Sequence, residues 1–160
     1  MSRPLVLVCE DGDEYLERFV RFFGAEFTFE RVTDLAGAHA ACGRGPVGLL
    51  FDLDFRRLAP DRLVDEAGLT APRHTPDEAR RLAEVQGALI LRGLRAAGVT
   101  TPALLFADLD DPARVAFLER TLAPLTVVSG GEGLGSVGGR LRSWLAAEGH
   151  APDHRSGKAG

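Results

Sequence analysis

The sequence predicts a three-layer α/β domain built on a parallel β-sheet. Short apolar segments recur along the chain, and each is followed by a segment with helical character. Most of these apolar segments are continuous rather than alternating, which is typical of strands that helices cover on both faces. The 160 residues fit one domain, and a hydrophobic fraction of 45% is that of an ordinary globular protein with a sizeable core.

Strands and helices alternate along the whole chain. The expected strands cover residues 5–9, 27–32, 47–51, 103–106 and 125–128, and the expected helices cover residues 14–23, 35–42, 76–97, 112–122 and 137–147. Asp13 and Asp34 stand at N-cap positions of the first two helices. The second strand, FTFERV, alternates apolar and polar residues, which favours a place at the edge of the sheet.

The spacing of the elements changes after the third strand. Nearly fifty residues separate Asp52 from the strand at Ala103, although a βαβ unit needs only about 30. Within this stretch, TPDE at residues 75–78 is a capping box with proline at the first helical position. We therefore expect an inserted helical segment at about residues 55–85, with a short helix within residues 58–69.

Acidic residues follow two of the expected strands. The run LLFDLDF ends in Asp52 and Asp54, and Glu10 and Asp11 follow the first strand. In an open α/β sheet, binding sites lie at the carboxyl ends of the strands. Glu10, Asp11 and Asp52 would repel one another there unless they were protonated or bound a divalent cation, and oxygen ligands suit Mg²⁺. The alternative is an ordinary solvated acidic rim, or carboxylates that cap a helix.

Composition narrows the classes of function. A formal charge of −4 gives no reason to expect nucleic-acid binding or attraction to a membrane surface. No apolar run approaches the roughly 20 residues of a membrane span, and the N-terminus lacks a signal-peptide pattern. Cys9 and Cys42 suggest reduced thiols and a cytoplasmic protein. We expect one domain over residues 1–149 and a disordered tail over residues 150–160, which lack apolar character.

Several segments resemble the receiver domain of bacterial response regulators. VLVCEDGDEY is similar to its first strand and acidic pair, and RVTDLAGAHAACGRGPVGLLFDLD to its second strand, second helix and third strand. QGALILRGLRAAGVTTPALLFADLDDPARVAFLERTLAP is similar to the third helix, fourth strand and fourth helix. The resemblance implies a flavodoxin-like (CheY-like) fold with strand order 2-1-3-4-5. It also implies Asp52 as phosphoacceptor and Mg²⁺ held by Glu10, Asp11 and Asp52.

The chain departs from the receiver pattern at the residues that respond to phosphorylation. Ala107 stands where receivers have Ser or Thr, Ser129 where they have Lys, and Thr126 near the place of their aromatic switch residue; the only lysine is Lys158. We therefore expect an atypical receiver, or pseudo-receiver. It would act as a stand-alone protein–protein interaction module in two-component signalling or a phosphorelay, without catalytic residues of its own. Phosphorylation at Asp52 would be weak or lost.

The resemblance also implies protein partners of a signalling pathway, a histidine kinase being one candidate. The usual receiver surface is the fourth helix, fifth strand and fifth helix, where Phe117, Leu118 and Trp144 supply apolar side chains, with Trp144 as the candidate anchor. The insertion is rich in arginine, which can bind phosphate or form a solvated face. These arginines are Arg56, Arg57, Arg62, Arg73, Arg80 and Arg81. An insertion so close to Asp52 could also act as a lid.

A second resemblance supports an enzyme as the alternative. LLFDLDF is similar to the nucleophile motif of haloacid-dehalogenase-type phosphatases, in which a first Asp attacks phosphate and a second acts as acid and base. Asp52 and Asp54 would take these roles in a Mg²⁺-dependent phosphatase with a phosphoaspartate intermediate. Three features disagree: Phe55-Arg56 replaces the motif's Gly-Thr, the domain offers no lysine, and two complete βα units precede the motif.

Overall fold

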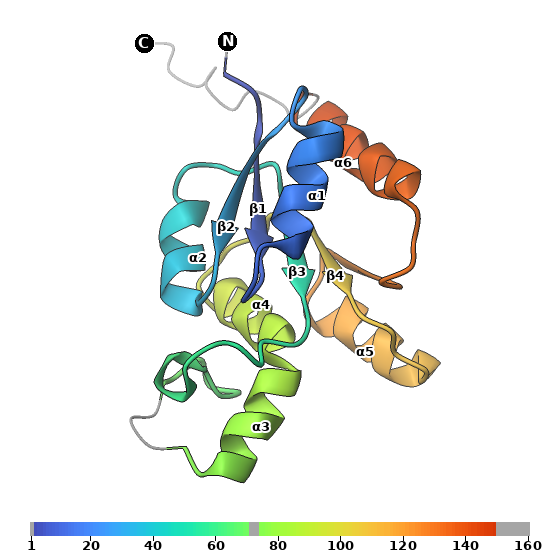
Figure 1. Ribbon diagram of the computed structural model, residues 1–160. Coiled ribbons are helices and arrows are strands. Elements are labelled where there is room, and N and C mark those ends of the chain that lie inside the picture. Colours follow the sequence, from blue (N-terminus) through green and yellow to red (C-terminus); the bar gives the residue numbers. More distant parts are fainter. Residues whose placement is uncertain (1, 71–73, 150–160) are drawn as a thin grey trace, which may run out of the picture.

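The computed structural model describes residues 2–70 and 74–149, whose centre is a five-stranded parallel sheet in the order β2-β1-β3-β4-β5 (Figure 1). Fold class and strand order are those predicted. The strands are β1 (Leu5–Cys9), β2 (Thr28–Val32), β3 (Gly48–Asp52), β4 (Ala103–Phe106) and β5 (Leu125–Val128). The helices are α1 (Glu14–Phe23), α2 (Leu35–Cys42), η1 (Pro60–Arg62, a 3₁₀ turn), α3 (Pro76–Glu84), α4 (Gln86–Ala96), α5 (Pro112–Thr121) and α6 (Leu134–Gly149).

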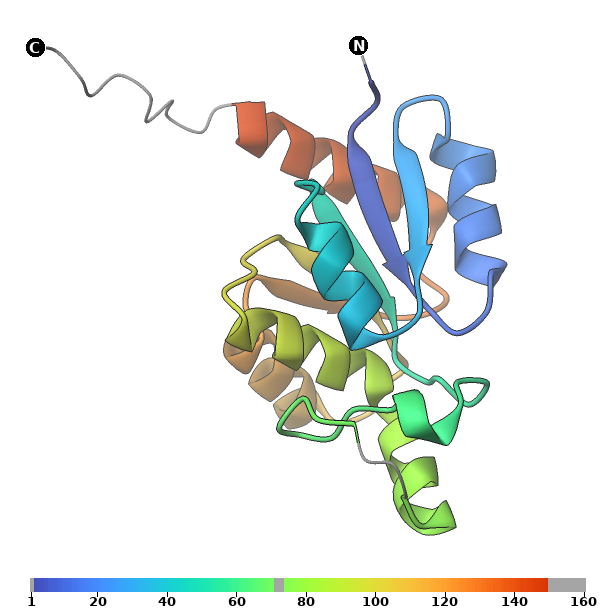
Figure 2. The same ribbon diagram turned by 90° about the vertical axis from the view of Figure 1, so that its left-hand side faces the viewer.

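Successive side chains of the central strands point to opposite faces of the sheet. In β1, Val6 and Val8 pack toward α1 and α6, whereas Leu7 and Cys9 pack toward α2, α4 and α5 (Figures 1 and 2). All four are at most 1% exposed, so the strand is buried on both faces, as its continuous apolar sequence predicted. Each large aliphatic side chain buried in this way contributes roughly 1.5–3 kcal/mol.

Two local signals of the sequence are confirmed. The Asp34 carboxylate accepts a hydrogen bond from the Gly37 N–H (2.8 Å) and caps α2. The Thr75 hydroxyl accepts from the Glu78 N–H (3.2 Å) and caps α3. Both signals lie within four residues of chain, so tertiary structure has little influence on them.

The insertion extends the hydrophobic core on the α2, α4 and α5 face. Phe55, Leu63 and Val64 are at most 2% exposed and belong to the same cluster as the strands. The fully buried Gln86 amide holds the insertion to α4. Its Oε1 accepts from the Val64 N–H (2.9 Å), and its Nε2 donates to the Val64 carbonyl (3.1 Å). The described part of the insertion up to Val64 is therefore anchored to the core.

Two predictions for this region are wrong in detail. The helix expected within residues 58–69 is only the η1 turn, followed by an isolated bridge between Val64 and Thr70. The single helix expected over residues 76–97 is two helices that meet at Val85. The chain that leaves β3 runs past this break and is hydrogen-bonded to both helices.

Backbone contacts explain the break between α3 and α4. The Phe55 N–H donates to the Ala83 carbonyl (2.8 Å), and the Gly87 N–H donates to the Leu53 carbonyl (3.0 Å). A Cβ at Gly87 would overlap the carbonyl oxygen of Asp52, so only glycine allows this close approach. The α4 helix thus lies directly against the end of β3, where Asp52 is placed.

The remaining differences concern the flanks of the domain. The last helix begins at Leu134 rather than at Val137. None of the helices within the described ranges has the length and hydropathy that a membrane span needs. The predicted tail, residues 150–160, lies outside the described residues.

Candidate functional site

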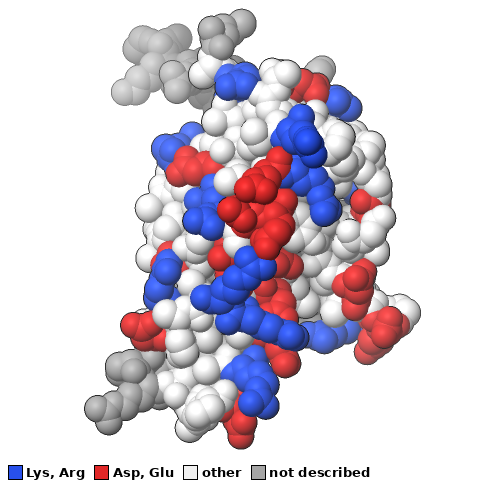
Figure 3. All heavy atoms as spheres, in the orientation of Figure 1, with Lys and Arg blue, Asp and Glu red and all other residues white. Residues whose placement is uncertain are grey.

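The carboxyl ends of the strands bring the predicted acidic residues to one end of the sheet. Asp52 ends β3, the central strand, and Glu10 and Asp11 follow the neighbouring β1. Figure 3 shows acidic side chains gathered in a column down the middle of the molecule, crossed by basic side chains. Adjacent parallel strands that end together account for the convergence of Asp52, Glu10 and Asp11.

Asp52 is half-buried, and its Oδ1 accepts a hydrogen bond from the N–H of Leu53 (2.9 Å). Burial raises the pKa of Asp52 to about 6, and the negative charges of Asp11, Glu10 and Asp54 add to the effect. The Leu53 bond opposes the rise because it favours the charged form. Asp52 therefore holds a proton more readily than an ordinary aspartate.

Glu10 caps the first helix. It is 1% exposed, its Oε1 accepts from the Tyr15 N–H (3.2 Å), and its Oε2 accepts from the Leu16 N–H (2.8 Å). Asp13, the predicted N-cap residue, makes no side-chain cap bond. Burial raises the pKa of Glu10, and the two bonds lower it in part. Both oxygens of Glu10 are thus committed to the backbone of α1.

Asp11 anchors the insertion. Its Oδ2 accepts a hydrogen bond from the Arg57 N–H (2.7 Å), and the Arg57 guanidinium pairs with Glu14 (2.5 Å). One residue earlier, Arg56 Nε contacts Asp54 Oδ2 at 2.7 Å. The two arginines at the start of the insertion therefore lie on the acidic residues that flank Asp52.

The hydrogen bonds of Glu10 and Asp11 affect whether these residues could bind a metal ion together with Asp52. Among the residues described here, no group of three or more His, Cys, Asp or Glu side chains is arranged to hold a metal ion. Glu10 uses both oxygens to cap a helix, and Asp11 is held by the insertion. With the Glu10 carboxylate capping α1, these three side chains do not form a ready-made site for a hard cation. Mg²⁺ binding itself stays a prediction.

The Asp108 carboxylate accepts two hydrogen bonds from residues at the end of β5. The Ser129 hydroxyl donates to Asp108 Oδ1 (2.9 Å), and the Gly130 N–H donates to the same oxygen (3.1 Å). Ala107, at the other position expected to contact a phosphoryl group, offers no side-chain donor, and its N–H is bonded to the Val128 carbonyl (2.9 Å). The contact between Asp108 and Ser129 joins residues 21 apart in sequence, and no local signal announced it.

Tyr15 is a site residue that sequence reasoning missed. Its ring stacks on Phe106 (centroids 5.0 Å apart) and on Phe19 (5.9 Å). Its hydroxyl lies 3.9 Å from where a Cβ of Gly130 would stand. Burial raises the pKa of Tyr15, and the charge of Asp52 raises it further, which keeps the hydroxyl protonated. The only sequence feature that could have indicated this role is that Tyr15 follows the acidic turn at residues 10–13 closely.

The described arginines of the insertion pair with acids other than Asp52. Arg62 donates hydrogen bonds to Asp34 Oδ2 from Nε (3.1 Å) and Nη2 (2.7 Å). Arg81 forms an ion pair with Glu66 at 2.8 Å. In the described part of the chain, none of the insertion's arginines contacts Asp52. Arg73 lies outside it.

The predicted interaction residues differ in exposure. Phe117 on α5 is 53% exposed, whereas Leu118 is half-buried against the core. Trp144 on α6 is half-buried and lies over Gly48, where a Cβ would overlap its ring. Of the three, Phe117 offers the most free apolar surface. The Trp144 ring packs against the core over Gly48. Its role as an anchor for a partner stays a prediction.

Solved structures that share this architecture include receiver domains of bacterial signalling proteins. A Francisella response regulator 1452 receiver domain matches with a TM-score of 0.65 at 13% identity, over 91% of this chain and 99% of that one. The signal receiver domain of a putative LuxO repressor protein from Vibrio parahaemolyticus matches with 0.62 at 13% identity, over 94% and 99%. That of a signal transduction histidine kinase from Syntrophus aciditrophicus matches with 0.59 at 15% identity, over 98% and 99%.

The similarity is one of structure. No protein-family model and no curated protein matches the sequence. TM-scores of 0.59–0.65 over nearly the whole chain show that it has the receiver-domain fold, at identities of only 13–15%.

Proposed function

We propose that this chain is an atypical receiver-like signalling module that acts through protein–protein interaction. Asp52 has the place of a phosphoacceptor, but its phosphorylation is weak or lost. One observation carries the proposal: the Asp108 carboxylate takes the Ser129 hydroxyl and the Gly130 N–H at the end of β5. Donors that could hold a phosphoryl oxygen are thereby bonded to a carboxylate of the protein itself.

Charge supports the same conclusion. A phosphoryl group on Asp52 would bring a charge of about −1.5 to −2 next to Glu10, Asp11 and Asp54. Each neighbouring unit negative charge at close range makes the phosphorylated state less favourable by on the order of 1–4 kcal/mol. The only lysine of the chain is Lys158, outside the described residues, so no lysine of the described residues offsets the repulsion.

The proposed setting is two-component signalling or a phosphorelay in the bacterial cytoplasm, with protein partners of which a histidine kinase is one candidate. Receiver domains among the structural neighbours support the signalling class. Two free cysteines, Cys9 and Cys42, support a reducing compartment. Output would pass through a surface of the domain, since we propose no catalytic residues.

The direct test is phosphotransfer from acetyl phosphate or phosphoramidate in the presence of Mg²⁺, read by intact mass. We expect no phosphoryl adduct on the wild type, nor on Asp52→Asn. A mass gain on the wild type that Asp52→Asn abolishes, and that the exposed control Asp110→Asn retains, would overturn the loss of phosphorylation and restore a phosphorylation switch.

The same samples decide the phosphatase alternative. Asp54, which would be its acid and base, has Oδ2 paired with Arg56 (2.7 Å) and Oδ1 buried without a partner in the described residues. This placement disfavours proton exchange with a substrate. We expect no turnover of p-nitrophenyl phosphate with Mg²⁺. Turnover that Asp52→Asn abolishes would establish the enzyme.

A further inference from the structure

Acidic side chains are concentrated at the carboxyl end of the sheet. Residues 10–14 and 52–54 contain six acidic residues and no basic residue. Burial and the charges of neighbouring acids raise the pKa of Asp52, so carboxylates of the two segments lie close enough to repel one another. The folded chain therefore needs positive charge at this end of the sheet.

Arg57 supplies positive charge to the turn after β1. Its guanidinium pairs with Glu14 (2.5 Å), and its backbone N–H donates to Asp11 Oδ2 (2.7 Å). A Cβ at Gly12 would overlap a terminal nitrogen of Arg57, so the absence of a side chain there lets the guanidinium lie against the turn. Arg31 of β2 adds a second guanidinium, whose Nη1 donates to the Gly12 carbonyl (2.7 Å). The acidic turn is therefore in contact with two arginines.

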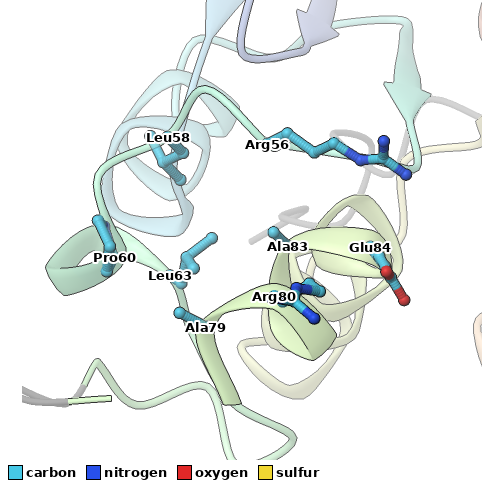
Figure 4. A pocket seen from close by; sticks show the side chains of 8 residues that line it. All are labelled: Arg56, Leu58, Pro60, Leu63, Ala79, Arg80, Ala83 and Glu84. Carbon is cyan, nitrogen blue, oxygen red and sulfur yellow. The ribbon is translucent and has the colours of Figure 1, made fainter. Parts of the chain in front are cut away.

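Arg56 supplies positive charge to the acidic segment after β3. Its Nε contacts Asp54 Oδ2 at 2.7 Å. Figure 4 shows the Arg56 side chain lying back along the chain toward the end of β3, on one side of a pocket of about 400 Å³, with Arg80 and Glu84 on the helical side. The Arg56 guanidinium is thus directed toward the acids at the end of β3.

The backbone holds the two neighbouring arginines in place. Phe55, the residue before them, is fully buried, and its N–H donates to the Ala83 carbonyl of α3 (2.8 Å). The bond from the Arg57 N–H to Asp11 fixes the chain two residues later. Exposed ion pairs contribute little when they stand alone, but charges joined in a network contribute more. Arg56 and Arg57 therefore act on the acids as a preorganised pair.

Backbone donors also occupy the carboxylates that would bind a cation. Four of the six oxygens of Glu10, Asp11 and Asp52 accept a hydrogen bond from a backbone N–H. A hard cation, which binds carboxylate oxygens, would have to compete with these donors and with the guanidinium groups. The arrangement favours charge compensation by the chain itself.

We propose that Arg56 and Arg57 are the resident counter-cations of this end of the sheet. Their two positive charges equal that of the divalent cation which the receiver resemblance implies, and they are delivered by the chain at a fixed place. They stabilise the acidic residues without a bound metal ion, and they lower the affinity of this end of the sheet for Mg²⁺. The inference goes beyond the proposed function, because it concerns what stabilises the acids whether or not Asp52 accepts a phosphoryl group.

The test titrates Mg²⁺ into the ¹⁵N-labelled full chain at constant ionic strength. The double variant Arg56→Gln/Arg57→Gln removes both charges and keeps the backbone N–H groups. We expect saturable shifts of the amides of residues 10–14 and 52–57 in this variant, with an apparent Kd for Mg²⁺ lower than that of the wild type by about tenfold or more. Arg80→Gln/Arg92→Gln, an equal loss of charge at exposed positions on α3 and α4, should behave as the wild type does.

Thermal unfolding gives a second measure. Without Mg²⁺, Arg56→Gln/Arg57→Gln should unfold at a lower temperature than Arg80→Gln/Arg92→Gln, because its acids have lost their counter-charges. Added Mg²⁺ should raise the unfolding temperature of the first variant through binding to its folded state. The wild type and the control variant should not respond.

Equal Mg²⁺ affinity of the wild type and Arg56→Gln/Arg57→Gln, including the absence of saturable binding in both, would overturn the inference. Equal unfolding temperatures of the two double variants without Mg²⁺ would do the same. The single variants Arg56→Gln and Arg57→Gln should give intermediate affinities, and they keep the test decisive if the double variant does not fold. Phosphorylation is measured separately by intact mass: an adduct on the wild type would overturn the proposed function and leave the counter-cations in place.

Discussion

The carboxylate of Asp11 accepts a hydrogen bond from the backbone N–H of Arg57, 2.7 Å away and 46 residues later in the chain. This bond joins the acidic turn after β1 to the start of the insertion. Arg57 reaches on to Glu14 (2.5 Å), and Arg56 contacts Asp54 (2.7 Å). The acidic residues around Asp52 and the insertion are therefore directly connected. A substitution in one of them should alter the stability of the other.

Loss of the Asp11 carboxylate should loosen the insertion. We expect Asp11→Ala to lower the free energy of unfolding by about 1–2 kcal/mol, because a charge-assisted hydrogen bond is lost. Amide hydrogen exchange should rise in residues 55–58. Asp110→Ala, which removes an exposed acid, is the matched control and should change neither quantity. Equal protection of residues 55–58 in both variants would show that Asp11 does not hold the insertion.

Removal of the Glu10 side chain should destabilise the whole domain. Glu10→Ala leaves the N–H groups of Tyr15 and Leu16 without their acceptor, which costs on the order of 2 kcal/mol. Glu10→Gln keeps one acceptor oxygen and should cost less. Asp13→Ala, at the N-cap position itself, should cost under about 0.5 kcal/mol. Urea unfolding measures all three, and a larger loss for Asp13→Ala than for Glu10→Ala would contradict the assignment of the cap.

The raised pKa of Asp52 should make the domain less stable at neutral pH. Its pKa is about 6 in the folded chain against 3.8 for an ordinary aspartate, so between these values the folded state binds more protons than the unfolded state. Stability then falls as the pH rises through this window and levels off above it. With a discount for partial exposure, Asp52→Asn should stabilise the protein by about 1–2 kcal/mol at pH 7.

The measurement is denaturant unfolding of wild type and Asp52→Asn at several pH values. The difference should vanish below about pH 3, where Asp52 is protonated in both the folded and the unfolded wild type. Glu10 also has a raised pKa, but it is present in both proteins and cancels in the comparison. A constant difference across the range would show that charge on Asp52 is not its cause.

A side chain at Gly87 should disrupt the crossing of β3 and α4. A Cβ there would overlap the Asp52 carbonyl oxygen, so we expect Gly87→Ala to cost about 1–3 kcal/mol through forced displacement of the backbone. Gly139, on an exposed face of α6, has nothing near its Cβ position. Gly139→Ala should therefore be neutral or stabilise by up to about 1 kcal/mol. Thermal unfolding compares the two, and equal effects would refute the close contact.

Restoring the missing donors should restore phosphorylation. We expect Ala107→Thr combined with Ser129→Lys to gain phosphoryl transfer from acetyl phosphate relative to wild type, because a hydroxyl and a cation would then face the group on Asp52. Ala107→Thr combined with Ser129→Met supplies the bulk of the lysine without its charge and should not gain. Intact mass measures the adduct. Equal labelling of both double variants would mean that the missing cation is not the obstacle.

The sequence by itself determined the five strands, the strand order implied by the receiver resemblance, and the caps at Asp34 and Thr75. These features depend on residues close together in the chain or on the ordered pattern of apolar runs. It also placed Asp52 correctly at the end of the central strand. Continuous burial on both faces of a parallel sheet leaves a strong apolar signal, which explains why this part of the prediction succeeded.

Only the tertiary structure decided how the acidic residues are used. That Glu10 rather than Asp13 caps α1 depends on the path of the turn. The break at Val85 depends on backbone bonds to Leu53 and Phe55, which lie far away in the sequence. The bonds of Asp11 to Arg57 and of Asp108 to Ser129 span 46 and 21 residues. Such contacts carry no local periodicity, because each exists only once the sheet has brought its two partners to the same end.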